Sequence, residues 1–347
     1  MIVRFVSGWF LAFLFLRKNR DMHRVLLILS ILLFIGCSQE TCRETVDAVP
    51  IQLEIQRIDK ELFQTQSAMQ IEELLDKYPA FSKLFLDADQ YPNNAVLAES
   101  IFNLIQNPSI DTLYQESLNA FQDIDQLMEE LGEAFGKLSV YYPATRIPVV
   151  QTAVTGLYKD LIISNEQIII GMDFFIGPDA SYPPQQIPEY ILNRYDTKHL
   201  PSNIMQFISS QYIQQSKGES MLAEMIDHGK SYYLLSKILP CTPENILIGY
   251  TDQEWEDALE NDAIIWANFI ENELLYSTDH QMKQKFLGER PNVYEISERC
   301  PGRIGRWLGW QIVKSYVEKT GASVQTLMEE PDANKVFRLS GYKPSGS

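Results

Sequence analysis

Two short apolar runs, Val149-Val150-Gln151-Thr152-Ala153-Val154 and Ile168-Ile169-Ile170-Gly171-Met172, decide the fold of this chain. Apolar runs of this length, set between segments of helical periodicity, are typical of buried strands. We therefore predict two strands, joined through residues 156–166.

The segments on both sides of these runs have mostly helical patterns. Before them, apolar residues at helical spacing mark helices around 71–78, 96–105 and 121–138, and the alternation of Ile51, Leu53 and Ile55 with polar residues predicts a strand. After them comes a Pro-rich segment, 178–188, which cannot be regular. Helices are then expected at 201–216, 220–239, 252–276, 301–320 and 323–340. This order predicts an α+β domain that is predominantly helical with a small β-sheet.

The N-terminal region contains a signal for export. The stretch His23-Arg24-Val25-Leu26-Leu27-Ile28-Leu29-Ser30-Ile31-Leu32-Leu33-Phe34-Ile35-Gly36-Cys37 has a basic start, a short apolar run, a small residue and then cysteine. Such a run is too short for a stable transmembrane helix. The ending resembles the lipobox of bacterial lipoproteins, which predicts lipidation of Cys37. The alternative is an uncleaved membrane anchor, which also exports the rest of the chain.

The segment before this signal does not fit it, because a second apolar run and a basic cluster precede Met22. We interpret Met22 as the better start of translation. The expected organisation is therefore a signal peptide over 1–36, a lipidated tether over 37–48 and a single globular domain over 49–347.

The composition excludes several classes of partner. The formal net charge is −17, and removal of residues 1–36, which carry five Lys and Arg against one Asp, makes it more negative still. Because such an acidic surface repels phosphate backbones and anionic headgroups, we expect no nucleic-acid binding. A hydrophobic fraction of 45% indicates a packed globule rather than a disordered chain.

Three cysteines follow Cys37, namely Cys42, Cys241 and Cys300. An oxidising compartment permits a disulfide between Cys241 and Cys300. The favoured expectation is instead that both are buried free thiols, with Cys42 in the tether either free or paired between chains.

The helices expected at 201–216 and 220–239 have the layout of a zinc peptidase of the His-Glu-x-x-His type. Such an enzyme carries two His ligands and a Glu base on one helix, and a third ligand on the next. Here Ser210-Gln211-x-x-Gln214 stands in that register and His228 falls near the third-ligand position. A hydroxyl and two amides neither hold zinc nor accept protons usefully. We interpret Ser210, Gln211, Gln214 and His228 as vestigial peptidase positions in a degenerate metallopeptidase-like domain. An ordinary amphipathic helix pair is the alternative.

Other chemical motifs are weak. The chain has no Gly-x-Ser-x-Gly elbow and no Walker pattern, and the spacing of Gly305 and Gly309 suits the close approach of another helix. We therefore expect no catalytic residue, no metal site and no cofactor.

Several segments together resemble the family of the gliding-motility lipoprotein GldB. The most specific is Pro301-Gly302-Arg303-Ile304-Gly305-Arg306-Trp307-Leu308-Gly309-Trp310-Gln311-Ile312-Val313, and it is joined by Gly249-Tyr250-Thr251, Trp266, Phe269–Tyr276 and Ser340-Gly341-Tyr342-Lys343-Pro344. The resemblance covers nearly all of the chain after the signal. It implies a lipid-anchored envelope protein needed for gliding and linked to type IX secretion. The family is also similar, distantly, to predicted His-Glu-x-x-His zinc peptidases.

Three functions remain open from the sequence. The first is a non-catalytic scaffold on a pseudo-peptidase fold, with a peptide groove between 204–213, 223–235 and the helix that contains Trp310. The second is a hydrolase with a non-standard site near Asp227 and His228. The third is a purely structural anchor. For the first, the possible partner-binding residues are Tyr212, Arg303, Arg306, Trp307 and Trp310, although a buried Trp pair is an equally good interpretation.

The expected partners are the lipid bilayer, through acylated Cys37, and other gliding or secretion proteins of the envelope. Ser38 is not the Asp that retains lipoproteins at the inner membrane, which favours the outer membrane, with the domain facing the periplasm.

Overall fold

The computed structural model describes residues 42–43 and 45–344, and the chain from Arg43 onward forms one compact unit. Cys37, Met22 and the expected signal peptide over 1–36 lie outside the described residues. Within the described part, no helix combines the length and the apolar character that a membrane span requires.

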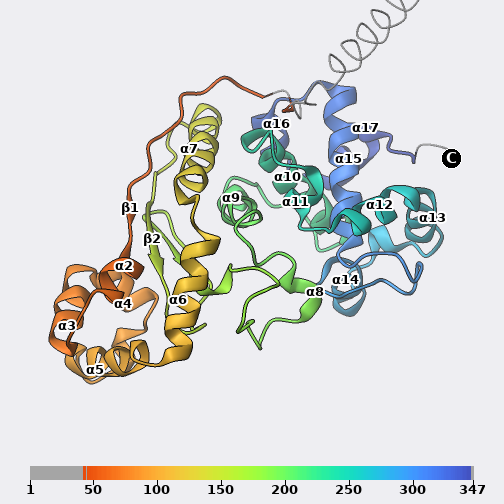
Figure 1. Ribbon diagram of the computed structural model, residues 1–347. Coiled ribbons are helices and arrows are strands. Elements are labelled where there is room, and N and C mark those ends of the chain that lie inside the picture. The colour runs from red at the N-terminus through yellow and green to blue at the C-terminus, as the bar shows by residue number, and fades with distance from the viewer. Residues whose placement is uncertain (1–41, 44, 345–347) are drawn as a thin grey trace, which may run out of the picture. The chain divides into compact units, whose positions relative to one another are not determined.

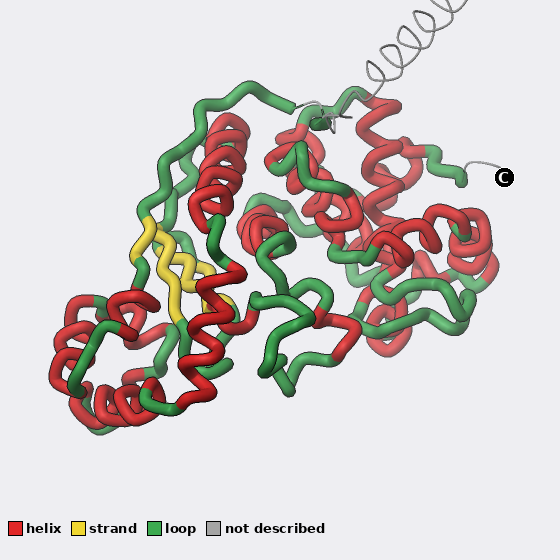
Figure 2. The backbone as a smooth tube through the Cα atoms, in the orientation of Figure 1, coloured by secondary structure: helices red, strands yellow, loops and turns green. Residues whose placement is uncertain are grey.

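A four-stranded sheet lies in the first half of the unit, with the order β1-β2-β4-β3. Strands β1 (Ile55–Gln56), β2 (Val149–Ala153) and β4 (Gln167–Gly171) are parallel, and β3 (Leu161–Ile163) is antiparallel to β4. Both predicted strands are confirmed, and β3 is an addition within the predicted connection. Figure 2 shows this small sheet, in yellow, among helices.

Helices make up most of the remaining chain, as predicted. Those before β2 are α2 (Ile58–Phe63), α3 (Ala68–Lys77), α4 (Pro79–Leu84), η1 (Ala88–Gln90), α5 (Asn94–Ile105), α6 (Pro108–Ala120) and α7 (Ile124–Tyr141). Those after β4 are η2 (Met172–Phe174), α8 (Glu189–Leu192), α9 (Leu200–Ser210), α10 (Met221–Ile238), α11 (Glu244–Ile248), α12 (Asp252–Glu260), α13 (Asp262–Glu271), η3 (Leu274–Tyr276), α14 (His280–Leu287), α15 (Ile304–Thr320), α16 (Val324–Met328) and α17 (Ala333–Ser340).

The sheet separates two hydrophobic clusters, because successive strand residues point to opposite faces. Ile168 and Ile170 belong to the larger cluster, with α7, α9, α10 and α15. Ile169 belongs to the smaller cluster, which is built mainly from α2 to α5. Figure 1 shows these N-terminal helices in orange at one end of the unit.

The close helix approach predicted from the Gly305-x-x-x-Gly309 spacing is present between α10 and α15, which lie side by side in Figure 1. A Cβ on Gly309 would lie 2.0 Å from the Met225 oxygen, and one on Gly229 would lie 2.4 Å from the Gly309 oxygen. Gly305 contacts Phe286 and Leu287 at α14 instead. The two long helices therefore touch backbone to backbone.

The strand predicted over 51–55 is wrong for most of its length, since only Ile55 and Gln56 pair. The preceding segment runs along α7, where the Ile51 amide donates to the Gly132 oxygen at 3.0 Å. A Cβ on Gly132 would lie 2.2 Å from the Ile51 oxygen, and one on Gly136 would lie 2.4 Å from the Val49 oxygen. These two helix glycines hold the extended chain in place of a strand partner.

Three predicted helices are shorter or broken. The helix expected over 201–216 ends at Ser210, because the following chain pairs with the C-terminal segment, through Gln214 N to Met328 O at 2.9 Å. The helix expected over 252–276 divides at Asn261 and again before Glu273, which has a left-handed φ of 53°. The helix expected over 323–340 divides before α17, in a segment that contains Pro331.

The expectation of buried free thiols is confirmed for Cys300 and wrong for Cys241. Cys42 and Cys241 are disulfide-bonded, whereas Cys300 is a buried free thiol. The Cys300 sulfur lies 3.9 Å from the Pro301 oxygen, and burial raises its pKa to about 12. Cys300 is thus an inert core residue.

Candidate functional site

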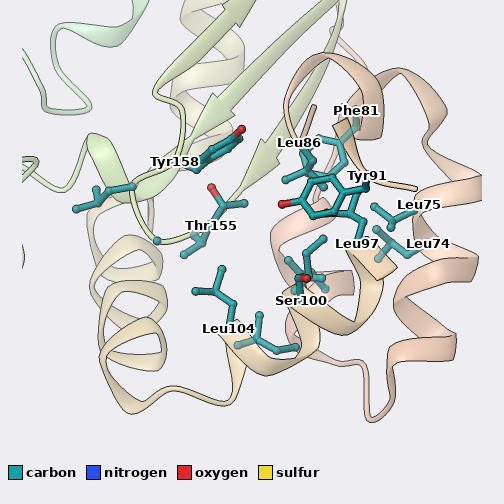
Figure 3. A pocket seen from close by; sticks show the side chains of 16 residues that line it. Leu74, Leu75, Phe81, Leu86, Tyr91, Leu97, Ser100, Leu104, Thr155 and Tyr158 are labelled. Atoms are coloured by element: carbon teal, nitrogen blue, oxygen red, sulfur yellow. The ribbon is translucent and has the colours of Figure 1, made fainter. Parts of the chain in front are cut away.

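A pocket of about 320 Å³ opens beside the small N-terminal helices. It lies between α3, α4 and α5 on one side and the loop that follows β2 on the other (Figure 3). Its lining is Leu62, Leu74, Leu75, Phe81, Leu86, Tyr91, Leu97, Ser100, Ile101, Leu104, Ile105, Val154, Thr155, Gly156, Leu157 and Tyr158.

The helical walls follow from the local sequence. Ser67 caps α3 by accepting a hydrogen bond from the Gln70 amide, and Asn93 caps α5 in the same way from the Val96 amide. Each helix then presents a stripe of Leu and Ile at helical spacing to the pocket. Their backbone groups pair within the helices, so the walls offer few polar atoms to a ligand.

The remaining wall is a strained loop folded around a buried carboxylate. Gly156 and Leu157 have positive φ values of 75° and 62°. The amides of Thr155 and Leu157 donate to Asp173 Oδ2 at 3.1 and 2.7 Å. Asp173 follows β4 as Thr155 follows β2, and the carboxyl ends of neighbouring parallel strands are a common location for ligand sites. Burial raises the pKa of Asp173, while the amide hydrogen bonds oppose that rise.

The rim of the pocket is aromatic. Tyr91 and Tyr158 are 37% and 51% exposed, and Figure 3 shows their rings on opposite sides of the opening. Tyr158 donates to Asp87 Oδ2 at 2.6 Å, and Lys159 Nζ contacts Asp87 Oδ1 at 2.7 Å. The hydrogen bond from Lys159 lowers the pKa of Asp87, so Asp87 is ionised at physiological pH and pairs with Lys159.

One polar atom inside the pocket has no partner. The Thr155 hydroxyl is buried and makes no hydrogen bond. Ser100, in contrast, donates to the Val96 oxygen at 3.0 Å. A buried hydroxyl without a partner costs free energy unless a ligand or water satisfies it.

The chemistry of this pocket is that of binding. None of its lining residues is charged. The carboxylate of Asp59, at the start of α2, is occupied by Arg57 at 2.6 Å and by the Thr152 hydroxyl. What remains is an apolar cavity with hydroxyl groups at its opening.

The residues interpreted as vestigial peptidase positions do not form one helical register. Ser210 is the last residue of α9 and Gln211 follows as its C-cap, whereas Gln214 lies beyond the helix. The i and i+4 positions of the register therefore do not share a helix face. Gln211 and Tyr212 instead line a separate pocket of about 190 Å³ beside α7 and the β3–β4 turn.

His228 lies on α10 and is partly buried. Desolvation is the main cause that lowers its pKa to about 3, with smaller contributions from the charges of Arg306 and Arg303. The imidazole is therefore neutral at physiological pH and is a weak base. A general base works best with a pKa near the operating pH.

Asp227, the proposed companion of His228, is occupied by structural contacts. Its carboxylate accepts from the Ser216 amide at 3.0 Å and from the Ser216 hydroxyl at 2.7 Å. Lys230 Nζ lies 3.5 Å away, is fully buried, and donates to Gln214 O at 3.2 Å and Glu330 O at 2.6 Å. The cluster fastens the chain after α9 to the C-terminal segment.

The expected partner anchors on α15 are internal. Trp307 and Trp310 are fully buried, which excludes direct contact with a partner. Their possible role in partner binding is therefore wrong, and both belong to the core. Arg303 is buried and donates to Ile248 O and Gly249 O at 2.7 and 2.8 Å. Arg306 Nε donates to Leu287 O at 2.6 Å. These two arginines, at the start of α15, bind backbone oxygens of neighbouring segments. The groove expected between α9, α10 and α15 is closed where α10 and α15 touch.

Sequence reasoning missed the apolar pocket. A usable signal was present in α5, where the exposed Ser100 interrupts the stripe of Leu97, Ile101 and Leu104. The loop that completes the pocket carries no such signal, because its shape depends on Asp173 from a different segment. Across the described residues, no group of three or more His, Cys, Asp or Glu is arranged to hold a metal ion.

Comparison with known proteins identifies the family. The family model described as gliding motility protein GldB matches residues 39–344. No curated protein matches the chain. No solved structure matches it either.

Proposed function

The chain belongs to the family of gliding motility protein GldB, and we propose that it is a lipid-anchored envelope protein of the gliding machinery that acts as a non-catalytic binding scaffold. The apolar pocket is the observation that carries the binding role. It is the largest concave apolar feature described above, and such pockets are the default sites for ligands.

The chain is fastened to the folded body a few residues after Cys37. Arg43 donates through its guanidinium to Leu239 O at 2.8 Å and to Thr242 O at 2.5 Å, and its amide donates to Pro240 O at 3.0 Å. These carbonyls lie at and after the C-terminal end of α10, where a cation is favourable. Six residues from Cys37 to Arg43 span at most about 20 Å. An acylated Cys37 would therefore hold the folded body close to a bilayer.

Support for a non-catalytic role comes from the ionisable groups. The hydrolase alternative needs His228 as a base and Asp227 as its partner. The lowered pKa of His228 and the contacts of Asp227 with Ser216 and Lys230 argue against that pair. Asp59 is paired with Arg57, and Asp173 Oδ2 accepts from the amides of Thr155 and Leu157, whereas Asp173 Oδ1 has no partner.

The proposed partners are other gliding or type IX secretion proteins of the envelope, with the anchor in the outer membrane and the domain facing the periplasm. The net charge of −17 argues against nucleic acid and against adhesion to anionic lipid through the protein surface.

Crosslinking in intact cells tests this proposal. A photoreactive amino acid replaces Tyr158 at the pocket rim, and in a matched control it replaces Tyr294, which is 62% exposed and outside the pocket lining. The scaffold role predicts a discrete envelope partner from position 158 alone, and its loss in a Cys37→Ala chain. Equal or absent crosslinking at both positions would contradict it.

A further inference from the structure

We propose that the apolar pocket binds a single fatty acyl chain, with the carbonyl end of that chain at the Thr155 hydroxyl. This inference deepens the proposed binding role and rests on it. It concerns the pocket between α3, α4, α5 and the loop 154–158.

The volume of the pocket suits a chain better than a side chain. At about 30 Å³ for a group of the size of a water molecule, 320 Å³ holds about ten such groups. A single inserted Leu or Phe would leave part of the space empty, and unfilled apolar space is unfavourable. An acyl chain can bend to fill the irregular space between Leu74, Leu97 and Leu104.

The backbone of the walls argues against a peptide. Three sides are helices whose amides and carbonyls pair internally. The fourth is the loop 154–158, whose Thr155 and Leu157 amides are both bound by Asp173. A buried peptide backbone would find few partners here, which is costly. An acyl chain has no polar groups along its length.

The polar atoms lie where a carbonyl group is needed. The Thr155 hydroxyl is buried, unpartnered and able to donate a hydrogen bond. Tyr91 faces it from across the opening in Figure 3. No charged residue lines the pocket, which favours an ester or amide carbonyl over a free carboxylate.

Two sources supply this chemistry in an envelope, namely a membrane lipid and the acylated N-terminus of a lipoprotein. Both present an ester- or amide-linked chain. The experiment separates them by the mass of the adduct.

The test uses the full chain in its own membranes. Cells are fed a clickable diazirine fatty acid, which enters lipids and lipoproteins, and are then irradiated. The protein is purified, and its adducts are located by mass spectrometry. We expect light-dependent adducts on the peptides that contain residues 94–105 or 154–158. A lipid-sized adduct identifies a membrane lipid, and a crosslink to Cys37 or to a second protein identifies a lipoprotein.

Matched variants of α5 check the location. Ser100→Trp places an indole at the pocket opening, whereas Glu99→Trp adds the same group at an exposed position outside the lining. Labelling of the pocket should fall at least about fivefold in S100W and stay unchanged in E99W, with both chains equally stable. Should S100W unfold, Thr155→Val is expected to reduce labelling instead.

Absence of adducts on these peptides in the unsubstituted chain would overturn the acyl assignment. If the S100W protein is folded and its pocket is labelled as strongly as that of the unsubstituted chain, the acyl assignment is overturned as well. If the partner crosslink at position 158 persists while acyl labelling is absent, the scaffold role stands and only this inference fails.

Discussion

The α10–α15 crossing and the pocket beside α5 are two ways in which the same chain uses apolar residues. At the crossing, Gly229 and Gly309 bring two backbones into contact, and Trp307 and Trp310 fill the space around them. Beside α5, the Leu and Ile stripe leaves about 320 Å³ open and a buried hydroxyl without a partner. Close packing is the normal state of a protein interior, so the open region is the exception that calls for a function.

The same comparison shows that the segment that resembles the family and the candidate binding site lie in different parts of the molecule. The run Pro301–Val313, on which the resemblance to the family is mainly based, belongs to the crossing, and its two tryptophans are buried. We infer that this motif maintains the fold, and that binding belongs to the N-terminal helices. Four substitutions test the two halves of this comparison.

The largest effect is expected at the crossing. Gly309→Val places a side chain where even a Cβ would lie 2.0 Å from the Met225 oxygen, so α10 and α15 must separate. We expect a loss of about 3 kcal/mol or more in the free energy of unfolding, measured by urea denaturation. Glu318→Val, on the exposed side of α15, is the control and should change little. A G309V chain as stable as the control would show that the crossing is not tightly packed.

A comparable loss is expected at Lys230, which is fully buried in the core beside the crossing. Lys230→Met leaves the oxygens of Gln214 and Glu330 without their donor, and Asp227 without its cation. Removing one member of such a cluster costs about 3 kcal/mol. Lys319→Met, at the exposed end of α15, is the matched control. Equal stability of the two variants would exclude a structural role for the buried ammonium group.

His228 should make stability depend on pH. Its pKa is about 3 in the folded chain against a usual 6.5, so the unfolded chain binds the proton more readily. The free energy of unfolding should therefore fall as pH decreases from 6.5 toward 3, and this contribution is complete above pH 6.5. His228→Gln should reduce the fall, while the exposed His280→Gln should not. Melting temperatures at pH 7.5, 5.5 and 4.5 provide the measurement, and an identical pH dependence in all three chains would refute the assignment. Gliding by H228Q cells at the normal rate would further weaken the hydrolase alternative.

The smallest effect is expected in the pocket. Thr155→Val replaces an unpartnered buried hydroxyl by a methyl group, so the ligand-free protein should gain up to about 1 kcal/mol. Thr152→Val is the control, and it should destabilise, because the Thr152 hydroxyl donates to Asp59. A T155V chain that loses as much stability as T152V would mean that the Thr155 hydroxyl already has a partner.

Much of the fold was predictable from local patterns. Apolar periodicity located α3, α5, α7 and α10, and the two runs at Val149 and Ile168 located the central strands. The missed boundaries have tertiary causes. Residues 49–53 are held by the glycines of α7, and α9 ends where Gln214 turns to pair with Met328. Such long-range pairings leave no local signal.

The site was less predictable than the fold. From the sequence, Trp307 and Trp310 could be interface anchors or core residues, and Arg303 an anchor, because these residue types are common at interfaces; burial gives all three a role in the core. The pocket combines α5 with a loop that Asp173 organises from a position 18 residues away from Thr155. No spacing rule connects those segments, so only the three-dimensional structure brings them together.

Whether the apolar pocket is needed for gliding is measured in cells whose only copy of the protein carries Ser100→Trp, with Glu99→Trp cells as the control at equal protein level. If the pocket is the functional site, S100W cells should fail to spread while E99W cells spread normally. Normal spreading by S100W cells would contradict a functional role for the pocket, and would mean that the site lies elsewhere on the protein.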